Sequence, residues 1–397
     1  MSNSYQSHRR KYQISRRANQ ISPSGIRKFF DLLASIEGVI SLGVGEPDFA
    51  TPWHICEAAI ESLEKGQTMY TSNLGMPELR QELSRYLKSN YALEYDPNNQ
   101  LLITVGSSEA LDLTMRAILN PGDEIIMSDP CYVAYTPCVI LAGGKPVMVP
   151  TSAENNFEIS AGDIEARVTN RTRAILIGYP ANPTGAVMSR EKLAEIAEVA
   201  KSRQLLVVSD EIYAKLVYDG EHTCFPTLPG MTDSTVLVGG FSKAYAMTGW
   251  RIGYVAGPKE IIAAVTKIHQ YTMMSAPTMG QVAAIEALKS GEESVTEMVD
   301  DYNRRRLVIV KGLIDIGLSC FEPKGAFYAF PSIKCTSMTS EDFAERLLTE
   351  EKVAVVPGSA FGEYGEGHVR CCYATSLADI EEALTRMKRF VDKYRKA

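Results

Sequence analysis

The chain has 397 residues, of which 45% are hydrophobic and 22% are charged, and its formal net charge is -7. The length predicts two or three domains, and the composition is typical of a soluble globular protein. The negative charge argues against a nucleic-acid partner. No apolar stretch approaches the roughly 20 residues of a membrane span, so we expect no membrane partner and a cytoplasmic location.

The N-terminal residues allow a second interpretation of the location. Arg9, Arg10, Arg16 and Arg17 precede the first acidic residue and are mixed with serines, which is a feature of organelle transit peptides. The segment shows little amphipathic periodicity, which favours the cytoplasm. The eight cysteines form no CxxC pair and the five histidines form no HExxH motif, so we expect reduced thiols and no metal site.

The first elements predict a helix over 26–33 and then a strand that runs into a turn over 39–48. The turn contains Gly43 and Gly45, but it lacks the third glycine of a dinucleotide-binding loop and no helix follows, so we reject that interpretation. Tyr70 comes later, ahead of a glycine turn, and the local sequence alone favours plain packing for this tyrosine.

From residue 101 short apolar strands alternate with amphipathic helices, which predicts a parallel sheet with helices on its faces. The strand 101–105 leads into Gly106, Ser107 and Ser108 at the start of a helix. The N–H groups and the positive dipole end of such a helix suit a phosphate, although a plain serine N-cap explains the sequence equally well.

The next two strands end in side chains that suit a flat ring. The strand 124–127 is followed by Tyr132, on whose face a ring could stack, with Tyr135 as the second choice. The strand 175–180 leads to Asn182, whose amide can donate a hydrogen bond and whose backbone is restricted by the following proline.

A carboxylate follows the strand 205–209. Asp210 should not stay buried without a partner, and a cation would satisfy it. Tyr213 comes three residues later and can donate a hydrogen bond. The alternative is a carboxylate that caps a nearby helix.

The strand 235–238 ends at a double glycine, and Lys243 follows. Beside apolar residues such as Phe241 and Trp250, its ammonium loses hydration and deprotonates more easily, as an amine must to form an imine with a carbonyl. Arg251 could bring a guanidinium to the same place and bind a phosphate. The ordinary alternative places the lysine on a solvated turn and the arginine on a surface strand.

Five of the places described above share one feature: each follows directly on a predicted strand. In an open α/β sheet the ligand lies in the crevice beyond the carboxyl ends of the strands. We therefore expect one crevice to contain Ser107 and Ser108, Tyr132, Asn182, Asp210 with Tyr213, and Lys243.

A change to strongly charged sequence after Gly291 predicts a domain boundary near residue 290. Beyond it we expect a long helix, a closing helix with apolar residues at helical spacing, and strands over 318–332, 352–356 and 368–374. Arg370 lies among apolar residues in the last strand, so it should have a partner, and a carboxylate matches its planar fork.

Several stretches match one family in order over nearly the whole chain. They are SLGVGEPDF, MYTSNLGMPELR, YPANPTG, SDEIY, FSKAYAMTGWRIGY, GAFY and VRCCYA. The chain resembles the class I/II aminotransferases, the pyridoxal-phosphate (PLP) enzymes of the aspartate aminotransferase family. The resemblance implies the α/β fold type I, with a large domain built on a mostly parallel central sheet between helices and a smaller α+β domain. The expected parts are 1–50 (N-terminal arm and part of the small domain), 51–290 (large PLP-binding domain) and 291–397 (small domain).

The resemblance also assigns roles to residues. Lys243 carries the cofactor and moves a proton, Asp210 keeps the ring nitrogen charged, and Tyr213 binds the ring oxygen. Further cofactor contacts are expected from Ser107, Ser108, Tyr132, Asn182, Ser242, Arg251 and, across a homodimer interface, Tyr70. Substrate contacts are expected from Gly45, Asn182 and Arg370. The Asn182-Pro183 peptide bond should be cis, and Gly240 stands where many relatives have a phosphate-binding serine, so Ser242 is the candidate for that contact.

The resemblance predicts a transaminase that moves an amino group between an L-amino acid and a 2-oxo acid by a ping-pong mechanism. Aspartate with 2-oxoglutarate is the favoured pair. The alternatives are an aromatic or diaminopimelate-type aminotransferase and a PLP-dependent β-lyase, because the same residues would serve them. A PLP-sensing transcription regulator would need a DNA-binding domain, for which the N-terminal residues are too few.

Overall fold

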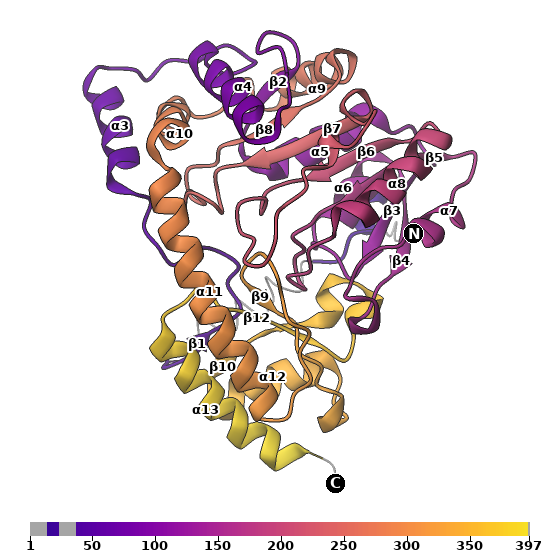
Figure 1. Ribbon diagram of the computed structural model, residues 1–397, viewed down its shortest axis with the longest axis vertical. Helices are drawn as coiled ribbons and strands as arrows, with labels where there is room; N and C mark the ends of the chain where they lie inside the picture. Colours follow the sequence, from indigo (N-terminus) through magenta and orange to yellow (C-terminus); the bar gives the residue numbers. More distant parts are fainter. Residues whose placement is uncertain (1–13, 24–36, 396–397) are drawn as a thin grey trace, which may run out of the picture.

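The computed structural model describes residues 14–23 and 37–395, and its largest unit is built on a seven-stranded sheet (Figure 1). The strand order is β2-β8-β7-β6-β5-β3-β4, and only β8 runs antiparallel to its neighbours in this sheet. The strands are β2 (Leu101–Thr104), β3 (Glu124–Asp129), β4 (Lys145–Pro150), β5 (Thr172–Ile177), β6 (Leu206–Asp210), β7 (Thr235–Gly240) and β8 (Gly253–Ala256). The predicted α/β fold with a mostly parallel sheet is confirmed.

Helices cover both faces of this sheet, because its strands bury side chains on both sides. Along β3, Ile125 and Met127 pack on one face and Ile126 packs on the other, which follows from the two-residue period of a strand. The helices on the first face are α5 (Gly106–Ile118), α6 (Tyr135–Ala142) and α9 (Lys259–Thr272), and α8 (Arg190–Ser202) lies on the second. A strand buried on both faces is apolar throughout, which is why the sequence shows short apolar runs here.

Further helices extend the large unit beyond the sheet. Near the β2 edge, α10 packs on both α3 and α4, and at the other side α1 contacts α6 and α7 contacts α8. Their bounds are α1 (Arg16–Asn19), α3 (Trp53–Glu64), α4 (Pro77–Tyr91), α7 (Ala161–Glu165) and α10 (Thr278–Ser290).

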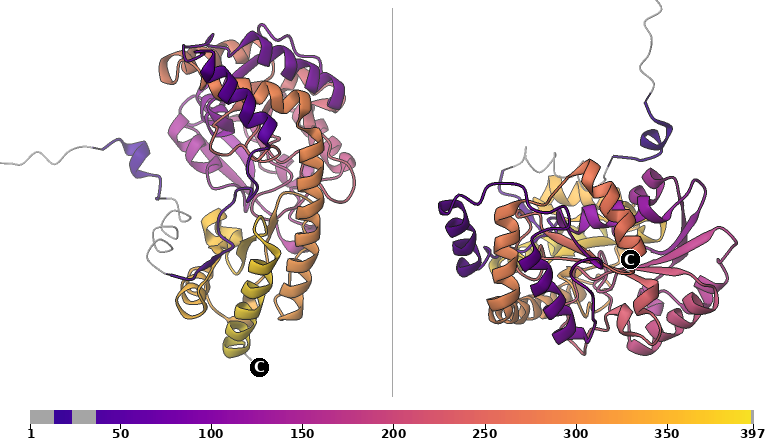
Figure 2. Two further views of the ribbon diagram at one scale, coloured as in Figure 1. Left: turned by 90° about the vertical axis from the view of Figure 1, so that its left-hand side faces the viewer. Right: turned by 90° about the horizontal axis from the view of Figure 1, so that it is seen from above.

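The smaller unit is reached through α11 (Glu292–Asp315), a long helix that runs beside α13 (Leu377–Tyr394) (Figure 1, Figure 2). It contains α12 (Ser340–Glu351) and an antiparallel sheet of order β11-β12-β9. A segment from early in the chain completes this unit, because β1 pairs in parallel with β10. The strands are β1 (Ile40–Ser41), β9 (Tyr328–Ala329), β10 (Val353–Ala354), β11 (Val356–Pro357) and β12 (Val369–Cys372). The domain limits at residues 50 and 290 stay predictions.

The strand expected over 318–332 is mostly absent, which corrects the prediction. Tyr328–Ala329 forms a strand of two residues, and Cys320, Gly325, Pro331 and Ser332 form isolated antiparallel bridges. The backbone N–H groups of Lys324 and Gly325 donate to the carbonyl of Gly185 in the large unit. The helix expected over 26–33 lies outside the described residues.

The eight cysteines are free thiols, of which Cys131, Cys224, Cys371 and Cys372 are buried. Within the described ranges, no helix is long and apolar enough to cross a membrane.

Candidate active site

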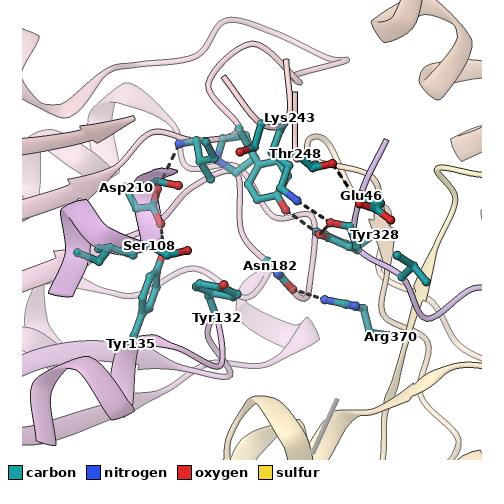
Figure 3. Close-up of a pocket in the computed structure, with 18 of the residues that line it drawn as sticks. Glu46, Ser108, Tyr132, Tyr135, Asn182, Asp210, Lys243, Thr248, Tyr328 and Arg370 are labelled. Atoms are coloured by element: carbon teal, nitrogen blue, oxygen red, sulfur yellow. Dashed lines mark hydrogen bonds between the residues drawn. The ribbon is translucent and has the colours of Figure 1, made fainter. Parts of the chain in front are cut away.

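A cavity of about 480 Å³ lies beyond the carboxyl ends of the parallel strands (Figure 3). Its volume falls in the range of about 300–1,000 Å³ that is usual for small-molecule sites. The start of α5 after β2 and the segments after β3, β5, β6 and β7 all contribute to its wall. Of the site residues predicted from the sequence, those that line it are Gly45, Ser107, Ser108, Tyr132, Asn182, Asp210, Tyr213, Ser242, Lys243, Arg251 and Arg370.

Lys243 lies just after β7, and its Nζ donates a hydrogen bond of 2.6 Å to the carbonyl oxygen of Gly45. The rings near the amine are Tyr213 and Phe327, whose centroids lie 5.9 and 5.7 Å from Nζ. Burial lowers the pKa of Lys243 to about 8, so the amine loses its proton close to neutral pH.

Asp210 ends β6 and is buried. Tyr135 Oη donates a hydrogen bond of 2.8 Å to Asp210 Oδ2, and the backbone N–H of Ile212 donates to Oδ1. Burial raises the pKa of the Asp210 carboxyl to about 6, and the bond from Tyr135 acts in the opposite direction. Both donors are neutral, so this carboxylate is suited to a cationic partner in the cavity.

The start of α5 forms a compact polar corner. Gly106 has a φ of +74°, and a Cβ there would lie 2.6 Å from Nη2 of Arg251. A Cβ on Gly253 would lie 2.4 Å from the backbone nitrogen of Ser107, so both positions require glycine. The N-cap of α5 is Val105 and no side chain caps the helix, so the interpretation of the serines as a plain N-cap is wrong. The helix N-terminus and the guanidinium together suit an anion.

Arg370 on β12 has only 2% of its surface exposed. Its Nη1 donates to Asn182 Oδ1 at 3.0 Å and its Nη2 donates to the carbonyl of Gly43 at 2.7 Å. Its Nε is buried and has no hydrogen-bond partner among the described residues. The partners it has are neutral, so a carboxylate from a ligand would satisfy both the charge and the remaining donor.

Three polar side chains that line the cavity were not among the site residues predicted from the sequence. Tyr328 lines the cavity from β9 and its hydroxyl lies 2.6 Å from that of Tyr213. Glu46 and Thr248 line the cavity too, and Thr248 Oγ1 donates to Glu46 Oε2 at 3.1 Å. All three lie within motifs shared with the family: Tyr328 in GAFY, Glu46 in SLGVGEPDF and Thr248 in FSKAYAMTGWRIGY.

The model of the family described as aminotransferase class I and II matches residues 37–387. The chain belongs to this family.

Individual members support the assignment. The aminotransferase is 59% identical over 374 residues to "Putative aminotransferase YugH" of Bacillus subtilis (strain 168), covering 94% of this chain and 97% of that protein. It is 46% identical over 379 residues to an aspartate aminotransferase of Pyrococcus abyssi, covering 95% of this chain and 97% of that one. The solved structure of an aromatic aminotransferase from Pyrococcus horikoshii OT3 superposes with a TM-score of 0.88 at 44% identity, covering 93% of this chain and 99% of that chain.

Members of this family depend on PLP, so the aminotransferase is a PLP-dependent transaminase. The cavity fits the cofactor by three features: a buried carboxylate with neutral donors at Asp210, an amine of lowered pKa at Lys243, and the anion-binding corner beside Arg251. The Asn182-Pro183 bond is cis, as predicted.

Ser242 and Tyr70, which are both predicted to bind the cofactor phosphate, lie differently with respect to the cavity. Ser242 is buried and lines the cavity, whereas Gly240 does not line it. Tyr70 has 81% of its surface exposed and lies outside the cavity lining of its own chain.

Proposed function

We propose that the aminotransferase transfers the amino group of a dicarboxylic L-amino acid, with aspartate favoured, to 2-oxoglutarate by a ping-pong mechanism. The observation that carries this proposal is the presence of Lys243, Asp210 and Arg370 in one cavity. A reactive amine, a carboxylate suited to a cation and an arginine suited to a carboxylate are the groups that amino-acid chemistry on a pyridine cofactor requires.

PLP, when bound, supplies an aldehyde carbon and a ring that withdraws electrons. In our proposal Lys243 binds it covalently, Asp210 pairs with the ring nitrogen, and Tyr213 and Asn182 bind the ring oxygen. Tyr132 supplies the face on which the ring stacks. The phosphate contacts are assigned to Ser107, Ser108, Ser242, Arg251 and Tyr70 of a second subunit.

Lys243 is the residue to which we assign proton transfer. Burial lowers its pKa to about 8, so the freed amine can accept a proton from the substrate Cα and return it near neutral pH. The carbonyl of Gly45 orients Nζ by accepting its hydrogen bond. Asp210, held by Tyr135, stabilises positive charge at the far side of the cofactor ring.

The substrate α-carboxylate is assigned to Arg370 and Asn182. These two side chains are already hydrogen-bonded to each other at 3.0 Å, and the Nε of Arg370 is a further donor. A buried guanidinium binds a carboxylate through two parallel hydrogen bonds, which fixes the orientation of the amino acid as well as its affinity.

The choice of aspartate rests on similarity to relatives named as aspartate aminotransferases. Among the described lining residues, the cations are Lys243, Arg251 and Arg370, each of which already has a role. An aromatic substrate is the second candidate, since Tyr132 and Tyr328 line the cavity and a similar structure is that of an aromatic aminotransferase.

Substrate choice can be tested with purified holoenzyme, 2-oxoglutarate and a panel of L-amino acids. We expect the highest kcat/KM for aspartate. Equal values for aspartate and alanine would contradict the dicarboxylic assignment, and a preference for phenylalanine or tyrosine would favour the second candidate. Release of ammonia and pyruvate from cystathionine would instead indicate a β-lyase.

A homodimer in the cytoplasm completes the proposal. The segments 69–73 and 271–274 both expose large apolar side chains, among them Tyr70 and Tyr271, which is 92% exposed. Hydrogen bonds join these two segments, including one of 2.7 Å from Asn73 Nδ2 to the carbonyl of Met274. Exposed apolar side chains held in one place suit a subunit interface. The free thiols fit a reducing compartment.

Hybrid dimers test the contribution of Tyr70 to a second subunit. Lys243→Ala subunits retain Tyr70 but have no reactive amine, and Tyr70→Ala subunits have the amine but lack the tyrosine. A hybrid should bind PLP at its one Lys243 with wild-type affinity, whereas the Tyr70→Ala homodimer should bind it more weakly. Equal weakness in the hybrid, or a monomer by sedimentation, would contradict the proposal.

A further inference from the structure

The hydroxyl of Tyr328 contacts both the hydroxyl of Tyr213 and the backbone of Gly45 (Figure 3). Its Oη lies 2.6 Å from Tyr213 Oη and 3.5 Å from the carbonyl oxygen of Gly45. The same carbonyl accepts the 2.6 Å bond from Lys243. A continuous set of polar contacts therefore runs from the smaller unit, through β9, to the tyrosine and the lysine of the large unit.

The position of this hydroxyl is tightly determined. Tyr328 is 1% exposed, and a Cβ on Gly45 would lie 2.6 Å from its Oη, so the glycine makes room for it. The guanidinium of Arg370 lies over its ring, 4.5 Å from the centroid, and the rings of Phe327 and Tyr213 pack edge-on at 4.9 and 5.8 Å. A ring packed in this way keeps its hydroxyl in one place.

The direction of the hydrogen bonds follows from the number of protons. Each hydroxyl has one proton to donate, so the short contact between Tyr213 and Tyr328 uses the proton of one of them. If Tyr213 donates to an acceptor in the cavity, Tyr328 must be the donor in this contact. The alternative acceptor for Tyr328 is the carbonyl of Gly45 at 3.5 Å, which is a weak hydrogen bond.

We propose that Tyr328 is a positioning residue that donates its hydrogen bond to Tyr213 and thereby directs the proton of Tyr213 to the phenolic oxygen of the cofactor. This rests on the proposed function, because Tyr213 has that role only if PLP occupies the cavity. A hydroxyl that accepts a hydrogen bond becomes a stronger donor. Loss of the Tyr328 hydroxyl therefore weakens the bond from Tyr213 to the ring oxygen.

The surroundings of the two hydroxyls contain few other titratable groups. Those that face them are Arg370 and Cys372 from β12, Tyr132 after β3 and Lys243 after β7. None of these is changed by a Tyr328→Phe substitution, so a change in proton affinity at the cofactor can be traced to the lost hydroxyl.

A pH titration of the holoenzyme tests the proposal. The absorbance of bound PLP reports whether the nitrogen that links it to Lys243 carries a proton. When Tyr213 donates more weakly, the ring oxygen keeps more negative charge. That charge stabilises the proton on the nitrogen that links PLP to Lys243, so the pKa of this nitrogen rises. We expect Tyr328→Phe to raise the midpoint by about 0.5 to 1 pH unit. The matched control is Tyr373→Phe, which removes a buried hydroxyl that donates to the carbonyl of Ala326 instead and should leave the midpoint unchanged. Equal midpoints in both variants and the wild type would overturn the proposal.

Two further measurements keep the test decisive. A 3-fluorotyrosine at position 328 keeps the shape of the residue but donates more strongly, so the midpoint should fall; a rise or no change would contradict the proposal. In a Tyr213→Phe background, Tyr328→Phe should add no further shift, since it acts through Tyr213. A wild-type protein that shows no PLP absorbance at any pH would instead contradict the proposed function.

Discussion

Tyr135 and Asp210 form a buried pair in which the phenol donates a hydrogen bond of 2.8 Å to the carboxylate. The two residues are 75 positions apart and come from α6 and β6. Gly178 makes this contact possible, because a Cβ there would lie 2.2 Å from Tyr135 Oη. Tyr135 was the second choice for a ring on which the cofactor stacks. It instead supports Asp210, the carboxylate that pairs with the cofactor ring in our proposal.

The first prediction concerns this pair. Tyr135→Phe removes one of two neutral donors to a buried carboxylate, so the anionic form of Asp210 becomes less favourable. We expect the affinity for PLP to fall about tenfold, which corresponds to about 1.4 kcal/mol. Titration of the apoenzyme with PLP measures it. The control is Tyr95→Phe, since the buried Tyr95 hydroxyl has no hydrogen-bond partner among the described residues. Equal affinities in the two variants would refute the role of Tyr135.

The second prediction concerns the stability of the apoenzyme and pH. Burial holds the pKa of Lys243 at about 8, below its ordinary value of 10.5, so the unfolded chain binds more protons between these limits and stability rises with pH across them. A Lys243→Met apoenzyme should therefore be more stable than the wild type below pH 8. The difference in free energy of unfolding between the variant and the wild type should shrink by about 2 kcal/mol between about pH 7 and about pH 9.5.

Urea unfolding at equal protein concentration measures this difference. The control is Lys65→Met, which removes an exposed lysine paired with Glu61 and should change the free energy of unfolding by less than about 1 kcal/mol. If the difference in free energy of unfolding between Lys243→Met and the wild type is the same at both pH values, burial does not lower the pKa of Lys243.

The third prediction concerns recognition of the α-carboxylate. Arg370→Lys keeps the charge but loses the planar fork and the bond to Asn182. We expect the dissociation constant of α-methylaspartate, which binds but has no α-hydrogen to lose, to rise about 100-fold, with PLP absorbance retained. Arg346→Lys, an exposed change beside Glu350, is the control. Unaltered binding in Arg370→Lys would show that the carboxylate lies elsewhere.

The fourth prediction concerns the backbone at Gly45. A Gly45→Ala side chain would lie 2.6 Å from the hydroxyl of Tyr328 and 3.4 Å from its ring, so the tyrosine must shift. We expect the free energy of unfolding to fall by about 1–3 kcal/mol and the affinity for the amino acid to fall with it. Gly162→Ala is the control, because a Cβ there meets open space at the start of a helix. A stable Gly45→Ala variant with normal affinity would mean that Tyr328 can move freely.

Much of the site could be predicted because parallel strands bring their carboxyl ends to one edge of a sheet. Asp210 ends the buried strand β6 and Lys243 lies shortly after the buried strand β7, so the strand pattern alone placed them together. Tyr328 could not be placed in this way, since its strand has two residues and its contact with Tyr213 spans 115 positions. The pairing of Tyr135 with Asp210 was equally hidden, because it depends on packing between a helix and a strand.

In our proposal the bound cofactor takes up the amino group of the substrate while Lys243 moves the proton. The most direct measurement is a single turnover, in which L-aspartate is mixed with PLP-loaded enzyme without any 2-oxo acid. We predict that the absorbance of the yellow form disappears while oxaloacetate is released, and that a Lys243→Ala variant shows no such conversion. An unchanged spectrum with every L-amino acid tested, or conversion by the variant at the wild-type rate, would contradict the claim.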